Sequence, residues 1–109
     1  MALDLNSLTG SILQAMQGAL GGHWSDVAPF AQTQAQSLAA TALQIQEGQA
    51  NGSIDSGTAG LLLQVQADES KATLAAVETV GESAAQDAVN ASIGVVKDAI
   101  NKAAGISFL

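Results

Sequence analysis

The feature that most constrains the fold of this chain is the spacing of its apolar residues, which recur every three or four positions over most of the 109 residues. That period is typical of helices that bury one face. Alanine is the commonest of these apolar residues, and it has the highest intrinsic helix propensity. The pattern is interrupted at Gly21-Gly22 and at Asn51-Gly52, where glycine favours a helix end. The sequence therefore predicts an all-α fold.

We expect a single domain over residues 1–109, folded as an antiparallel helical bundle around a hairpin of two long helices. The four helical segments are predicted at about 5–20, 26–50, 55–80 and 83–104. Asp55 is the predicted N-cap of the third segment, with Ile54 and Ala59 placed as the two halves of a hydrophobic staple. Pro29 is expected in the first turn of the second segment, where a helix tolerates proline.

The connection around Gly81 leaves two arrangements open, because neither proline nor a loop-like cluster separates the last two segments. At ~100° per residue, however, their apolar stripes lie about half a turn apart, far more than the drift of ~20° per heptad in a regular helix. Either the chain breaks near Gly81, which we favour, or one long kinked helix presents its halves to different neighbours. The predicted inward stripes are Leu62, Val65, Ala72, Ala76, Val77 and Val80, then Ala85, Val89, Ile93, Val96, Ile100 and Ala103.

The composition excludes most chemistry. The chain has no cysteine, no tyrosine and no arginine, and His23 is its one histidine. Catalysis, metal binding and phosphate recognition depend on these residue types. The formal net charge of −7 also disfavours nucleic acid, since affinity for a polyanion comes from Lys and Arg. We therefore expect no enzyme activity, no cofactor, no catalytic or metal site, and no nucleic-acid partner.

Membranes are a less favoured alternative. No run approaches the ~20 apolar residues of a transmembrane helix, and the N-terminal stretch lacks the positive residues of a secretory signal. We expect a cytoplasmic protein, with export by a signal-independent route left open. The segment 5–25 carries no formal charge if His23 is neutral, which suggests a membrane-surface or pore-forming alternative. Interfacial helices usually carry Lys and Arg, however, and this chain is acidic.

A polar layer is predicted inside the bundle. Glu69 falls on the predicted inward stripe, one turn from Gln66 and from Thr73, and Gln34 lies on the facing helix at a similar level. Such a layer can fix helix register or oligomeric state. The alternative is a carboxylate metal site of the ferritin-like kind, which is less favoured because the sequence lacks the Glu-x-x-His motif of those bundles.

Self-association is the predicted function. Alanine removes little surface from water, so a core rich in alanine is thin and gains from a second chain. The apolar tail after the last helix is also expected to be buried, in the bundle or in a neighbouring subunit. We expect a non-enzymatic assembly subunit or adaptor that forms a homodimer or larger assembly, with another protein as an alternative partner. The predicted interface residues are Val89, Ile93, Val96, Ile100, Ile106, Phe108 and Leu109.

Overall fold

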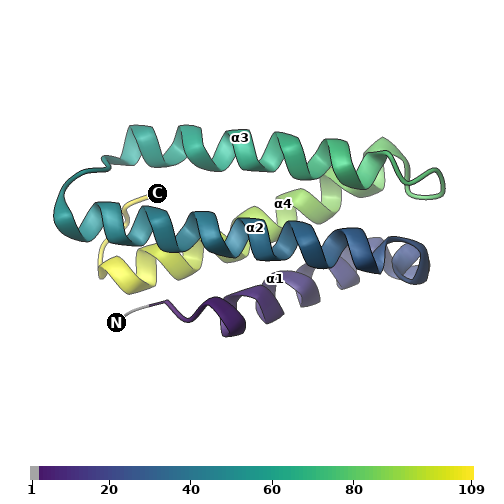
Figure 1. Ribbon diagram of the computed structural model, residues 1–109, viewed down its shortest axis with the longest axis horizontal. Coiled ribbons are helices and arrows are strands. Elements are labelled where there is room, and N and C mark those ends of the chain that lie inside the picture. Colours follow the sequence, from purple (N-terminus) through teal and green to yellow (C-terminus); the bar gives the residue numbers. More distant parts are fainter. Residues whose placement is uncertain (1–2) are drawn as a thin grey trace.

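A computed structural model describes residues 3–109, so that Met1 and Ala2, part of the stretch assessed for a signal, lie outside it. The described chain is helical and without strands (Figure 1). Its elements are α1 (Leu5–Leu20), the short 3₁₀ helix η1 (Gly21–His23), α2 (Trp24–Asn51), α3 (Ser56–Ala75) and α4 (Gly81–Ala104). The predicted all-α helical bundle is confirmed.

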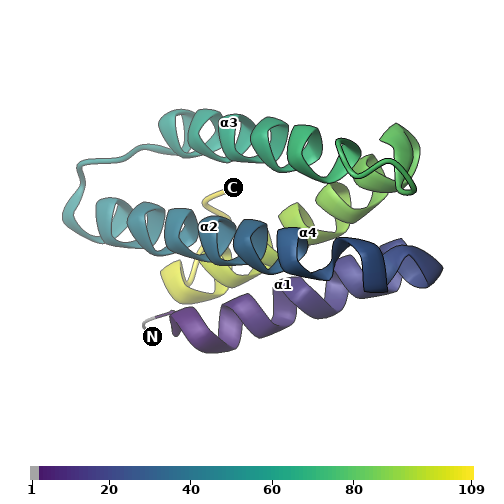
Figure 2. The ribbon, with the colours of Figure 1, turned by 45° about the vertical axis from the view of Figure 1, so that its right-hand side comes forward.

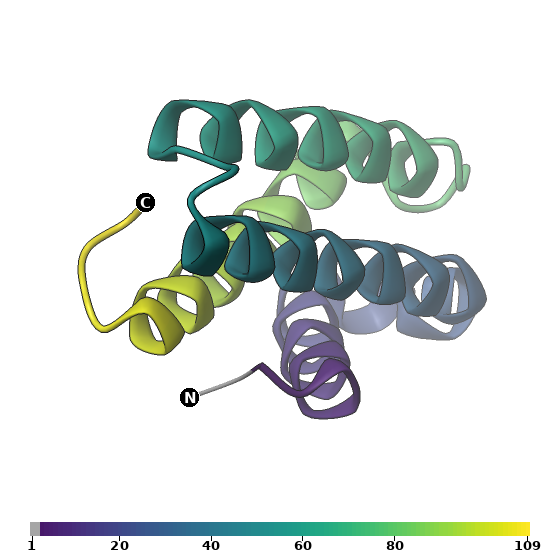
Figure 3. The same cartoon turned by 60° about the vertical axis from the view of Figure 1, so that its left-hand side comes forward.

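Each α-helix runs antiparallel to the one before it (Figure 1). Helices α2 and α4 contact each other and lie between α1 and α3, which do not touch. Two further views show α1 and α3 on opposite sides of this central pair (Figures 2 and 3). The described chain measures 42 × 23 × 18 Å. Helix α3 therefore has helices on one side only, and its other side faces outward.

The helix ends follow local chemistry. The Asp55 carboxylate accepts a hydrogen bond of 2.7 Å from the Thr58 backbone N–H, so the predicted N-cap of α3 is confirmed. Helix α2 ends at Gly52, whose φ of 79° suits glycine. The position predicted for Pro29 is wrong, because α2 begins at Trp24 and Pro29 falls in its second turn. There the missing N–H removes one helical hydrogen bond.

The chain reverses direction between α3 and α4, so the alternative of one long kinked helix is wrong. Helix α3 stops at Ala75 rather than at residue 80, and residues 76–80 form a turn. The Thr79 hydroxyl donates a hydrogen bond of 3.1 Å to the Asp26 carboxylate on α2, and Val80 is buried. Gly81 then begins α4 with a φ of 76°, which only glycine adopts readily.

The core lies between α1, α2 and α4 and is completed by one face of α3. The predicted inward stripe of α4 is buried at Ala85, Val89, Val96 and Ile100 and half-buried at Ile93 and Ala103. Leu5 on α1 and Phe30 on α2 are exposed. The largest fully buried apolar side chains are Ile12, Met16, Leu20, Leu38, Ile45, Leu74, Ile100, Val27 and Val96.

The predicted inward stripe of α3 is wrong. The buried residues of this helix are Ala59, Leu63, Ala67, Ser70 and Leu74. Leu62, Val65, Ala72 and Ala76 of the predicted stripe are exposed, and Val77 is half-buried in the turn. Val80 alone of the stripe is buried as predicted. The physical reason is that α3 carries apolar residues on both sides, as the run Leu61-Leu62-Leu63 illustrates. Periodicity alone cannot then select the side that faces the core.

Candidate interaction surface

The outward side of α3 carries three of the six large apolar side chains that are exposed in the described chain. We define the outer α3 face as Leu61, Leu62, Val65, Glu69 and Ala72, all of which are exposed. Leu61 keeps 70% of its surface accessible and Val65 keeps 66%. At ~100° per residue Leu61, Val65 and Ala72 lie roughly opposite Leu63 and Leu74, which are buried. Leu62 and Glu69 lie at the edge of this face towards α2. A helix apolar on both sides is normally covered on both, and here one side is bare.

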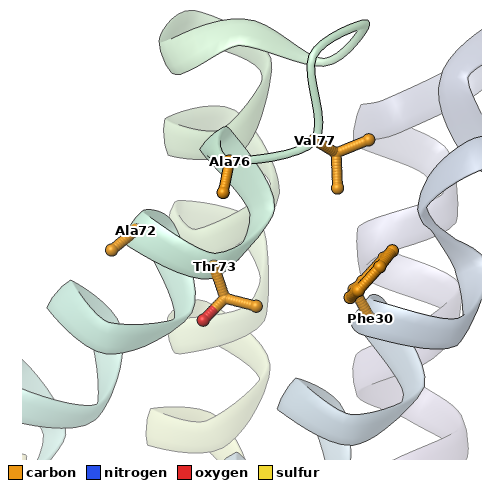
Figure 4. Close-up of a pocket in the computed structure, with 5 residues that line it drawn as sticks. All are labelled: Phe30, Ala72, Thr73, Ala76 and Val77. Atoms are coloured by element: carbon orange, nitrogen blue, oxygen red, sulfur yellow. The ribbon is translucent and has the colours of Figure 1, made fainter.

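A pocket of about 520 Å³ continues this face towards α2. We call it the Phe30 pocket, and its lining residues are Phe30, Ala72, Thr73, Ala76 and Val77. The ring of Phe30 projects from α2 opposite Thr73 and Val77 (Figure 4). Phe30 is 48% exposed, although an aromatic ring gains much by burial. Small side chains at Ala72 and Ala76 leave the hollow open.

Polar side chains join α2 and α3 beneath this surface. The Ser70 hydroxyl donates a hydrogen bond of 2.8 Å to Gln34 Oε1, and both side chains are buried. Further along, the Thr41 hydroxyl donates to Gln66 Oε1 at 3.4 Å, while Gln66 Nε2 is buried without a hydrogen-bond partner. Paired groups of this kind fix how α3 sits on α2, since an unpaired buried polar atom is destabilising.

The predicted polar layer is present only in part. Gln34 is buried as expected, and Gln66 and Thr73 are half-buried at the edge of the α2–α3 contact. Glu69 is exposed, so its predicted place inside the bundle is wrong. The sequence reasoning missed Ser70, the residue that actually pairs with Gln34. Its spacing from Leu63, Ala67 and Leu74 would have revealed it had the correct face of α3 been chosen.

The predicted interface on α4 is wrong for the folded chain. Val89, Val96 and Ile100 are buried by the helices of the chain itself, and Ile93 is half-buried against the core. Val89, Val96 and Ile100 are therefore not available to a second molecule. They supply the thin alanine-rich core with its larger apolar groups.

The C-terminal tail divides into two parts. Phe108 and Leu109 are half-buried and pack against the core. The Asn101 side chain holds the tail, since the Leu109 N–H donates to Asn101 Oδ1 at 2.7 Å and Asn101 Nδ2 donates to the Leu109 oxygen at 3.4 Å. Ile106 remains 59% exposed. Of the predicted tail residues, Ile106 alone presents a largely free apolar side chain.

The electrostatics of the described residues are simple. Hydrogen bonds from Ser7 lower the pKa of Asp4, and hydrogen bonds from Thr58 lower the pKa of Asp55. Both are helix N-caps, at which a carboxylate is stabilised by backbone N–H groups. Within residues 3–109 no three His, Asp or Glu side chains come together as metal ligands would. No helix in the same range combines the length and apolar character needed to cross a membrane.

Comparisons of this chain with protein families, with curated proteins and with solved structures found no match.

Proposed function

We propose that this protein is a non-enzymatic, self-associating helical protein that acts as an assembly subunit or adaptor, and that the outer α3 face is its interface. The observation that supports the proposal is the exposure of Leu61 and Val65 on a helix whose opposite side is fully packed. Contiguous exposed apolar surface of this kind marks interaction sites in folded proteins.

The distribution of exposed apolar groups favours this face over others. Leu61, Leu62 and Val65 lie within two turns of α3, and Phe30 stands beside the same helix. The other large exposed apolar side chains of residues 3–109, Leu5 and Ile106, belong to α1 and to the C-terminal tail and are not part of this cluster. Single exposed apolar residues are ordinary on protein surfaces. A cluster flanked by an apolar pocket is what an interface requires.

The test is the solution mass measured by light scattering on a sizing column over a range of protein concentrations. The wild-type mass is expected to rise above the chain mass of 10.9 kDa as concentration increases. The double variant Leu61→Ser, Val65→Ser is expected to stay at the mass of one chain, because it replaces two exposed apolar groups with hydroxyls. Circular dichroism checks that both proteins are equally helical.

Ile106→Ser is the matched control, since Ile106 is exposed to a similar extent but lies in the tail. This variant is expected to associate as the wild type does. A wild type that remains one chain at every concentration would overturn the proposal. If Ile106→Ser no longer associates while the α3 double variant still does, the interface lies in the tail. Flotation with liposomes by a wild type that stays monomeric would instead support membrane binding.

A further inference from the structure

The outer α3 face changes character along its length. Its first half carries the large side chains of Leu61, Leu62 and Val65, and its second half carries Ala72 and opens into the Phe30 pocket. One half is therefore raised and the other is hollow. Among the residues that define the face, Glu69 alone carries a formal charge, and it lies midway between Leu62 and the pocket residue Ala76. The exposed Asp68 borders the face on its α4 side.

A two-fold dimer brings the same surface of each copy together. When the two helices run antiparallel, the first half of one α3 lies on the second half of the other. We propose that a second copy of this chain binds in this way, with Leu62 of each copy entering the Phe30 pocket of the other and Val65 of each lying on Ala72 of the other. This inference rests on the proposed self-association and adds its geometry.

The sides of α3 also agree with the antiparallel arrangement. At ~100° per residue Leu62 lies on the side of the face nearer α2, which is where Phe30 places the pocket. An antiparallel two-fold keeps the α2 sides of both copies together, so Leu62 meets the pocket. A parallel two-fold would set each pocket against the opposite edge of α3, which carries Asp68 and Lys71. Covering those charges is unfavourable, and both pockets would stay empty.

Glu69 lies close to the two-fold axis of the antiparallel dimer, because it is midway between residues that pair across it. The two Glu69 carboxylates then face each other, and like charges at short range repel. This repulsion therefore limits the association of the wild type. Added salt is expected to strengthen the association, because it screens the repulsion. Lys71 is directed to the α4 side, where Asp68 and Glu82 lie near it, and does not neutralise the axis.

Disulfide trapping tests the arrangement, and the absence of cysteine from the chain gives it no background. Helix axes ~8–10 Å apart leave facing Cα atoms near the two-fold axis roughly 3.4–5.4 Å apart, which overlaps the Cα separation of disulfides. Under mild oxidation Glu69→Cys is expected to cross-link to itself. A mixture of Leu62→Cys and Ala76→Cys is expected to give a mixed dimer, more than either variant gives alone. Asp68→Cys, one residue from Glu69 but on the α4 side, is the control and should form much less cross-linked dimer.

Self-cross-linking of Leu62→Cys, or no cross-link at Glu69→Cys in a protein that light scattering shows to be dimeric, would overturn the antiparallel geometry and leave the proposed function standing. If the wild type has the mass of one chain at every concentration, both the proposed function and the antiparallel geometry are overturned. The two failures are thus distinguishable.

A charge-swap experiment measures the contribution of Glu69. Glu69→Lys alone is expected to dissociate as readily as the wild type, because two lysines repel as two glutamates do. Mixed with wild type, it should favour the heterodimer by about tenfold, since Glu and Lys then meet at the axis. Asp68→Lys makes the same change of charge at the α4 edge of the face, farther from the facing copy, and should show a weaker preference. Equal preference in both mixtures would overturn the placement of Glu69.

Discussion

The Ser70 hydroxyl of α3 donates a 2.8 Å hydrogen bond to Gln34 Oε1 of α2, and both side chains are buried between the two helices. The bond joins the outermost helix to the central pair. It also ties α3 to a single rotational setting, in which Leu63 and Leu74 face inward and Leu61 faces outward. The orientation of the proposed interface depends on this pairing.

Ser70→Ala is expected to lower the free energy of unfolding by about 1–3 kcal/mol, because it leaves the buried Gln34 oxygen without a donor. Denaturant unfolding followed by circular dichroism measures the change. Replacing both partners, as in Gln34→Leu with Ser70→Ala, should recover much of the loss, since no polar atom is then left unpaired. If the single and double variants are equally destabilised, the hydrogen bond is not what holds α3 in place.

Two leucines of α3 that are two positions apart are expected to respond differently to truncation. Leu63 is 2% exposed and Leu61 is 70% exposed. Leu63→Ala should lower the free energy of unfolding by about 2–5 kcal/mol, as core truncations do, whereas Leu61→Ala should change it by less than about 0.5 kcal/mol in dilute, monomeric protein. Equal losses would show that α3 is rotated relative to the structure described above.

The sequence predicted the four helices and most of their ends because those depend on local signals. Asp55 as a cap and Gly52 as a stop are recognised within a few residues. The setting of α3 was not predictable in the same way, since Leu62 and Leu63 are equally apolar and the choice between them depends on contacts with α2 and α4. Because the wrong side of α3 was chosen, Glu69 was predicted to lie inside the bundle. For the same reason, the exposed side of α3 was not predicted as a surface.

The prediction of an interface on α4 was wrong for a related reason. Val89, Val96 and Ile100 form a regular stripe, and a stripe predicts burial without identifying the partner. The contacts of α4 with the other three α-helices bury these residues in the same molecule. Only the three-dimensional arrangement distinguishes a stripe covered within the chain from one left for another copy.

Acid is expected to destabilise the fold through its N-caps. The pKa of Asp55 is lowered below its ordinary value of 3.8 by hydrogen bonds from Thr58. The ionised carboxylate is therefore bound more favourably in the folded state, and its contribution is present above pH 3.8 and is lost as the pH falls through that value towards the folded pKa. Asp4, whose pKa is lowered by Ser7, acts in the same direction.

Asp55→Asn keeps a capping side chain but removes this titration. The free energy of unfolding should then fall less between pH 5 and pH 3 in the variant than in the wild type, as measured by denaturant titrations at each pH. Parallel pH profiles for the two proteins would show that the Asp55 cap does not contribute to acid sensitivity.

Gly48 is expected to tolerate alanine poorly although its backbone is helical. It lies in α2, and the Ile54 side chain covers it so closely that an added Cβ would overlap Ile54 Cδ1 and Cγ1. A backbone hydrogen bond also joins the two residues, since the Ile54 N–H donates to the Gly48 oxygen at 3.1 Å. Gly48→Ala should lower the free energy of unfolding by about 1–3 kcal/mol, the usual range for overpacking.

Gly94→Ala is the matched control for this substitution, because Gly94 lies inside α4 with open space around its Cα. Here alanine should raise the free energy of unfolding by about 0.5–1 kcal/mol through its higher helix propensity. Thermal and denaturant unfolding of the two variants compare the effects directly. Stabilisation by both substitutions would mean that Ile54 does not pack on Gly48, and that the α2–α3 connection, and with it the start of α3, is held in some other way.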